Sequence, residues 1–94
     1  MSIFTVIVSK KALRQLSLLP LHIQFKLQAW IDGVENDGLM EMRKISGFHD
    51  EPLKGVRVGQ RSIRLNKAYR AIYTICADGS LEFVEILEVN KHKY

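Results

Sequence analysis

Residues 54–73 read KGVRVGQRSIRLNKAYRAIY, and this stretch decides the fold that the sequence predicts. β-Branched and aromatic residues are frequent in 62–65 and again in 69–75, as is typical of two short strands. The polar residues 66–68 lie between the two segments and interrupt the apolar pattern. The stretch therefore predicts a β-hairpin closed by a tight turn.

The predicted hairpin is strongly basic, because no acidic residue occurs between Lys54 and Arg70. A loop formed by residues 66–68 places Arg64 directly opposite Arg70 on one face of the sheet. Like charges in that position destabilise a sheet, so we expect an anion, most naturally a phosphate, to bind there. A solvated positive face that serves only solubility is the alternative interpretation. The cations of this stretch are Lys54, Arg57, Arg61, Arg64, Lys67 and Arg70.

The composition predicts one globular domain over residues 1–94, with 47% hydrophobic and 26% charged residues. Lysine and arginine outnumber aspartate and glutamate by 14 to 10, and the net charge of +4 favours a polyanionic partner. The single cysteine, Cys76, predicts no disulfide and no metal site, and it fits a reduced cytoplasmic setting. The apolar residues before Lys10 are too few to span a membrane, so no membrane partner is expected.

Two helices are predicted between a first strand and the hairpin. Residues 3–8 are apolar and β-branched, as in a strand, and Ser9 is a suitable N-cap for a helix over 10–17. A longer amphipathic helix follows Pro20, because apolar residues recur there at spacings of three and four. Gly38 predicts the end of this helix.

The rest of the chain predicts loops and a further strand. Residues 39–46 fit neither period and form either a short helical turn or an irregular connection, and 47–52 predict a surface loop. A tight turn at 78–79 precedes a strand over 81–89, and a basic tail follows at 90–94. We therefore predict an α+β fold with an N-terminal strand and a helical hairpin. The helices pack on one face of an antiparallel sheet of about four strands, which leaves the other face for a ligand.

The side chains that carry chemistry narrow the possible reactions. The sequence contains no nucleophile triad, no phosphate-binding glycine loop and no metal-ligand cluster. We expect Glu82, Glu85 and Glu88 to pair with cations across strands rather than to act as acids or bases. Lysine, arginine, histidine and tyrosine remain, and these suffice for metal-free RNA cleavage. A base removes the ribose 2′-hydroxyl proton, cations stabilise the phosphorane, and an acid protonates the departing 5′-oxygen.

Histidines and tyrosines supply the candidates for proton transfer and base stacking. Taken singly, His49 and His92 are typical of ordinary surface histidines, but a loop and a tail bring each within reach of the basic sheet. At least one of Tyr69 and Tyr73 is expected in the core, and base stacking is the alternative role. Tyr94 offers both a stacking face and a hydroxyl group.

Four segments carry a resemblance to a known family. They read FHDEPLKG at 48–55, GQRSIRL at 59–65, YRAIY at 69–73 and EVNKHKY at 88–94. On these segments the chain resembles the RelE/HigB superfamily of type II toxin-antitoxin toxins, which are ribosome-dependent mRNA interferases. The resemblance covers nearly the whole chain. It implies a RelE-like fold, a cytoplasmic endoribonuclease without metal or cofactor, and a cognate antitoxin, the ribosome and mRNA as partners.

The resemblance also implies roles for individual residues. Arg64 and Arg70 would hold the scissile phosphate, and His92 and Tyr94 would supply proton transfer or base stacking. As general base, His92 stands ahead of His49. The residues implied to bind RNA are Lys54, Arg57, Arg61, His49 and Tyr73.

Two other functions are compatible with the same fold. Gyrase inhibitors of the ParE type share the scaffold without the nuclease residues, and a non-catalytic RNA-binding module is the second alternative. The joint presence of Arg64, Arg70, His92 and Tyr94 favours the nuclease. Mapping of mRNA ends after translation in vitro separates the three.

Overall fold

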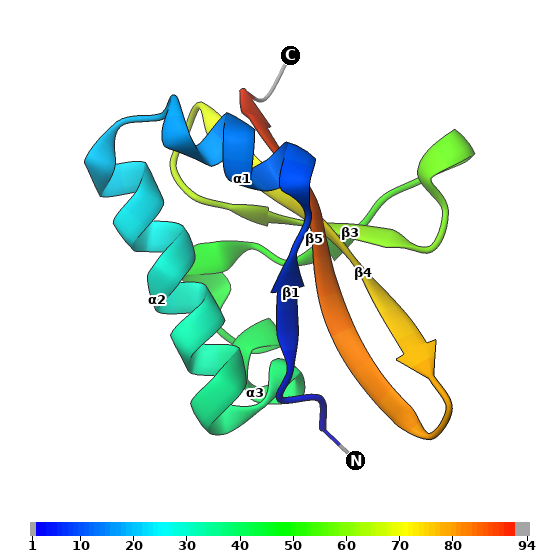
Figure 1. Ribbon diagram of the computed structural model, residues 1–94. Helices are drawn as coiled ribbons and strands as arrows, with labels where there is room; N and C mark the ends of the chain where they lie inside the picture. Colours follow the sequence, from blue (N-terminus) through cyan, green and yellow to red (C-terminus); the bar gives the residue numbers. More distant parts are fainter. Residues whose placement is uncertain (1, 92–94) are drawn as a thin grey trace.

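The computed structural model describes residues 2–91 and shows an α+β fold in which helices cover one face of a five-stranded sheet (Figure 1). One strand precedes the three α-helices and the others follow them. This order confirms the predicted helical hairpin packed on a sheet. The strands are β1 (Val6–Val8), β2 (Glu51–Pro52), β3 (Gln60–Arg64), β4 (Tyr69–Asp78) and β5 (Leu81–Lys91). The helices are α1 (Lys10–Ser17), α2 (Leu21–Asp37), α3 (Leu39–Arg43) and the 3-10 helices η1 (Ser46–Phe48) and η2 (Gly55–Arg57).

The sheet has the strand order β1-β5-β4-β3-β2. Strands β2 to β5 pair antiparallel, whereas β1 runs parallel to β5, with Val6 opposite Val84. The sheet differs from the expected one in two details: β1 pairs parallel to β5, and β2 adds a fifth strand. These two strands have only three and two residues, too few for a residue pattern to indicate their partners. Pro52 in β2 suits an edge strand, since proline has no N–H for the ladder.

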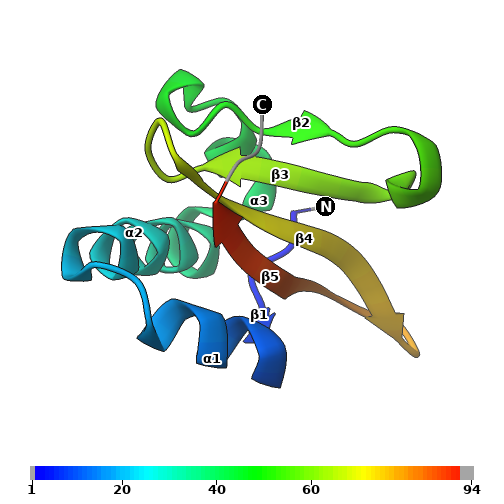
Figure 2. The same ribbon diagram turned by 90° about the horizontal axis from the view of Figure 1, so that it is seen from above.

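Strands β3 and β4 lie side by side and form the central hairpin (Figure 2). The hairpin has the predicted register, with Arg64 of β3 opposite Arg70 of β4. The side chain of Asn66 closes its turn. Asn66 Oδ1 accepts hydrogen bonds from the backbone N–H groups of Ala68, at 2.7 Å, and Tyr69, at 2.8 Å. These bonds satisfy backbone N–H groups of the turn that have no partner in the β-ladder. Asparagine side chains commonly form such bonds in turns.

Strands β4 and β5 are both longer than the sequence predicts. β4 continues to Asp78, and β5 extends to Lys91, which pairs with Tyr69. Asn90 and Lys91 therefore belong to the strand rather than to the predicted tail. The remainder of that tail, residues 92–94, lies outside the described part of the chain.

The helices begin and end where the sequence indicates. Ser9 caps α1, because its Oγ accepts from the N–H of Ala12 at 3.0 Å and donates to the carbonyl of Leu87 at 2.9 Å. α2 starts after Pro20 and ends at Gly38, whose φ of 91° costs glycine little. Residues 39–43 form the short helix α3. Within residues 2–91, no helix has the length and apolar character needed to cross a membrane.

The core lies between the helices and the covered face of the sheet. Trp30 of α2 is fully buried, and its ring centroid lies 5.2 Å from that of Tyr73 on β4. Full burial of a large apolar side chain stabilises a fold by about 1.5–3 kcal/mol. Core residues include Ala12, Ile23, Leu27, Trp30, Val34, Ile63, Ala71, Tyr73, Val84, Ile86 and Val89.

Candidate functional site

An open pocket lies beside the turn of the β3–β4 hairpin. Its lining includes three cations, Arg64, Lys67 and Arg70, together with His49 and Glu51. The cations come from the hairpin, whereas the other two residues come from the segment that follows η1. Two segments separated in the sequence therefore meet at one site, which we call the hairpin pocket.

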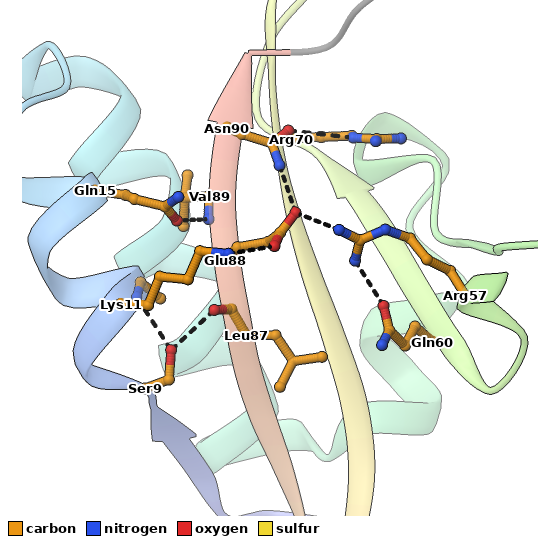
Figure 3. Close-up of polar contacts among 11 residues, drawn as sticks. Ser9, Lys11, Gln15, Arg57, Gln60, Arg70, Leu87, Glu88, Val89 and Asn90 are labelled. Atoms are coloured by element: carbon orange, nitrogen blue, oxygen red, sulfur yellow. Dashed lines mark hydrogen bonds and ion pairs between the residues drawn. The ribbon is translucent and has the colours of Figure 1, made fainter.

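The two arginines share one face of the sheet because they pair directly across β3 and β4. Arg64 is exposed, and Nε of the half-buried Arg70 lies 3.4 Å from Oδ1 of Asn90 on β5 (Figure 3). Within residues 2–91, neither guanidinium forms an ion pair with a carboxylate. The pocket therefore presents two adjacent positive charges in the fork geometry that suits phosphate oxygens.

His49 adopts an uncommon backbone conformation at the hairpin pocket. Its φ of 47° and ψ of 52° are left-handed, and no other non-glycine residue among 2–91 has a positive φ. Its Nε2 lies 3.3 Å from Oε2 of Glu51. Left-handed backbone costs an ordinary residue about 1–2 kcal/mol and persists where the surroundings hold it, often at functional sites.

Arg61 and Tyr73, two residues expected to bind RNA, form a buried network with Asp50 instead. They pair across β3 and β4, and both donate to the Asp50 carboxylate, Arg61 Nε to Oδ1 at 2.6 Å and Tyr73 OH to Oδ2 at 2.5 Å. Tyr73 is fully buried, and the Arg61 side chain is 21% exposed. The expected role of Arg61 and Tyr73 in RNA binding is corrected, because the geometry of the strands directs both side chains to the face opposite Arg64 and Arg70. Arg61 stands three positions from Arg64, and residues an odd number apart point to opposite faces.

The two donors to Asp50, Tyr73 and Arg61, keep their protons over the physiological range. Burial raises the pKa of the Tyr73 hydroxyl far above its usual value, and the hydrogen bond to Asp50 adds to this shift. Burial alone would lower the pKa of Arg61, but its hydrogen bond and charge attraction to Asp50 raise it. Both donors therefore stay protonated near neutral pH.

On the open face of the sheet, Glu88 joins cations from two distant segments (Figure 3). Its Oε2 lies 3.1 Å from Lys11 Nζ of α1, and its Oε1 lies 2.8 Å from Arg57 of η2. Asn90 Nδ2 also donates to Oε1, at 2.7 Å. Burial would raise the pKa of Glu88, but the hydrogen bond from Lys11 and the charge of Arg57 outweigh it, so the pKa is lowered. Glu88 therefore pairs with α1 and η2 rather than across strands.

Three of the predicted site residues come together in the hairpin pocket, namely Arg64, Arg70 and His49. Lys54 is exposed, and Arg57 is bound to Glu88; neither lines this pocket. The last two predicted residues, His92 and Tyr94, lie outside the described residues.

Sequence reasoning missed three polar residues of the site. Glu51 lies beside His49, and Asn90 lies beside Arg70. Asp50 forms an ion pair with Arg61. The adjacent His-Asp-Glu of residues 49–51 was the available signal, since polar loop residues of this kind often carry function. In the part of the chain that the structure describes, no group of three or more His, Cys, Asp or Glu side chains could hold a metal ion.

Comparisons with known proteins were informative only at the level of structure. The fold and site define an α+β domain with helices on one sheet face and a basic hairpin pocket on the other. No family model matches the chain, and no curated protein matches it by sequence. Solved structures match along almost its whole length.

The matching structures are toxins of type II toxin-antitoxin systems. The YoeB/ParE toxin from Agrobacterium tumefaciens is 17% identical with a TM-score of 0.72, covering 95% of this chain and 99% of that one. YafQ from E. coli is 15% identical with a TM-score of 0.72, covering 93% and 91%. The toxin-antitoxin complex RelBE2 from Mycobacterium tuberculosis is 26% identical with a TM-score of 0.60, covering 96% and 99%. These matches confirm the RelE-like fold and support the resemblance to the RelE superfamily.

Proposed function

We propose that this protein is the toxin of a type II toxin-antitoxin system and inhibits translation by cutting mRNA on the ribosome. The observation that carries the proposal is the hairpin pocket, where Arg64 and Arg70 pair across two strands and His49 joins them. Guanidinium groups bind phosphate oxygens at two points, and histidine exchanges protons near neutral pH. Toxins of the same fold support the same class.

The proposed cleavage uses the 2′-hydroxyl of the RNA and needs no metal. A base removes the proton of this hydroxyl, the 2′-oxygen bonds to phosphorus, and the bond from phosphorus to the 5′-oxygen breaks. An acid protonates the departing 5′-oxygen, and a 2′,3′-cyclic phosphate remains. Arg64 and Arg70 stabilise the negative charge that develops on the phosphorane. DNA is no substrate because it lacks the nucleophile.

Two histidines are proposed to transfer protons. His49 is supported by its place in the hairpin pocket and by Glu51, whose Oε2 lies 3.3 Å from the imidazole Nε2. His92 and Tyr94 keep the roles of proton transfer or base stacking that the resemblance implies. Replacing each histidine by glutamine preserves size and hydrogen bonding and removes the titratable ring, so the two variants separate their contributions.

The proposed partners are the ribosome with its mRNA and a cognate antitoxin, all in the cytoplasm. The neighbour from Mycobacterium tuberculosis was solved as a toxin-antitoxin complex, which supports an antitoxin here. The net charge of +4 favours an acidic partner segment through electrostatic steering. The exposed Lys54 remains a proposed RNA contact, whereas Arg57 must first exchange Glu88 for a phosphate.

Translation in vitro with mapping of mRNA 5′ ends tests the proposal. We expect new ends at ribosome-occupied codons, and none on the same mRNA without ribosomes. Arg64→Ala and Arg70→Ala should lose the cuts, while Lys44→Ala removes one exposed charge outside the hairpin pocket and should keep them. Gyrase poisoning without mRNA cuts would identify a ParE-type inhibitor, and neither activity would indicate a binding module.

A further inference from the structure

The carboxylate of Asp50 has no solvent exposure, and both of its oxygens are hydrogen-bonded. Its two donors, Arg61 and Tyr73, stand opposite each other on the central strands β3 and β4. Tyr73 is itself fixed, because it is fully buried and packs against Trp30. Asp50 therefore ties the segment between η1 and β2 to the paired central strands of the sheet.

The residues on either side of Asp50 lie in a different environment. His49 and Glu51 are exposed and line the hairpin pocket, whereas Asp50 does not. His49 is also the residue with left-handed backbone, a conformation that persists only where neighbouring structure holds it. On one side of His49 the chain is fixed by its own N–H bond to Ser46. On the other side of His49, the chain is held by the side chain of Asp50, which is bonded to Arg61 and Tyr73.

We propose that Asp50 is a positioning residue, which anchors the segment after η1 to the sheet and so holds His49 in its left-handed conformation at the hairpin pocket. Arg61 and Tyr73 then serve the site indirectly, as the donors that retain Asp50. The inference rests on the proposed function, since His49 must transfer a proton during cleavage for its position to affect the rate.

A double-mutant cycle distinguishes positioning from a general structural role. Asp50→Ala and His49→Gln should each lower kcat on ribosome-bound mRNA by about 100-fold and leave KM within about twofold. Because both changes remove the same function, His49→Gln combined with Asp50→Ala should be no slower than either variant alone. The limb of the pH–rate profile that depends on His49 should vanish in both single variants.

Further variants keep the test decisive if Asp50→Ala does not fold. Tyr73→Phe keeps the buried ring and removes one donor, so it should lower kcat in the same direction, by about tenfold. Val84→Ala opens a cavity in the core where β5 pairs with β1, and it should lower stability without changing kcat. His22→Gln removes an exposed histidine of α2 and should have no effect.

Backbone chemical shifts of His49 supply a readout that does not depend on cleavage. They should change in Tyr73→Phe and in Asp50→Ala and stay constant in Val84→Ala. Unchanged His49 shifts in both anchor variants, or rate losses that multiply in the double mutant, would overturn the inference. A wild-type protein that cuts no mRNA would refute the proposed function, and the His49 shifts would still decide the positioning role.

Discussion

The pairing of Arg64 with Arg70 is unfavourable for the free protein. Two positive side chains directly opposite each other destabilise an antiparallel sheet by about 0.2–1 kcal/mol. The side-chain oxygen of Asn90, 3.4 Å from Arg70 Nε, offsets part of the charge. A bound phosphate removes the repulsion, so stability and phosphate binding place opposite demands on these two positions.

Arg70→Gln should therefore affect activity and stability in opposite directions. The variant keeps most of the apolar stem of the side chain and removes the charge. We expect cleavage on the ribosome to fall by about two to three orders of magnitude. The free energy of unfolding in urea should rise by about 0.2–1 kcal/mol. Lys44→Gln, which removes a charge outside the pocket, is the control. A variant of Arg70 that is less stable than wild type and equally active would contradict this account.

Single residues differ in how far the sequence predicts their place. The facing of Arg64 and Arg70 follows from the length of the turn, and it was predicted correctly. The inward direction of Arg61 and Tyr73 follows from strand alternation, since each is three positions from one of these arginines. The pairing of these two residues with Asp50 was not predictable, because an acidic residue in a loop gives no periodic signal that identifies its partners before the chain is folded.

The hairpin turn decides whether the hairpin pocket forms at all. Asn66 Oδ1 accepts two backbone hydrogen bonds, and Leu65 N–H donates to the carbonyl of Tyr69 at 2.9 Å to close the ladder. These contacts fix the register by which Arg64 meets Arg70. A slip of one residue would move every side chain of one strand to the other face of the sheet.

Asn66→Ala should weaken the hairpin and the site together. Two hydrogen bonds are lost, each worth about 0.5–1.5 kcal/mol, so the free energy of unfolding should fall by about 1–3 kcal/mol. Cleavage should fall as well, because the spacing of the two arginines becomes less well defined. Asn36→Ala removes one exposed bond on α2 and should change neither quantity measurably. Equal effects of the two asparagine substitutions would show that the turn bonds do not set the register.

Among the elements, those with a long pattern and the N-terminal strand were predicted, whereas β2 was not. α1, α2 and the central hairpin carry enough residues for a period, a cap or a turn to be recognised in the sequence. β1 was predicted as a strand within residues 3–8, but its parallel pairing with β5 follows only from the folded chain. β2 is a strand only because it pairs with the edge of β3, a tertiary effect that a local pattern cannot contain.

At the scale of the molecule, Glu88 connects parts of the chain that no strand or helix joins. Lys11 lies on α1 and Arg57 on η2, and the pair of Arg57 with Glu88 spans β4 between them. Ile72, the neighbour of Glu88 on β4, is fully buried although it lies outside the core cluster. Glu88 therefore stands beside a fully buried apolar residue of the neighbouring strand, and its ion pairs link β5 to α1 and η2.

This network predicts a pH dependence of stability. The pKa of Glu88 is lowered from its ordinary value of 4.5, mainly because the hydrogen bond from Lys11 and the charge of Arg57 outweigh burial. Its contribution is therefore complete above about pH 4.5 and is lost as the pH falls through the lower pKa of the folded state. Glu88→Gln should cost about 1–2 kcal/mol at pH 7, a modest value because Lys11 and Arg57 are partly exposed.

Urea unfolding of wild type and Glu88→Gln at a series of pH values between about 7 and 2 measures this effect. The difference in free energy of unfolding should be constant down to about pH 5 and then shrink, because protonation of Glu88 in the wild type makes the two proteins equivalent. Glu35→Gln, a change at an exposed carboxylate of α2, should follow the wild-type curve throughout. A difference between wild type and Glu88→Gln that stays constant to pH 2 would mean that Glu88 stabilises the fold by packing and not by its charge.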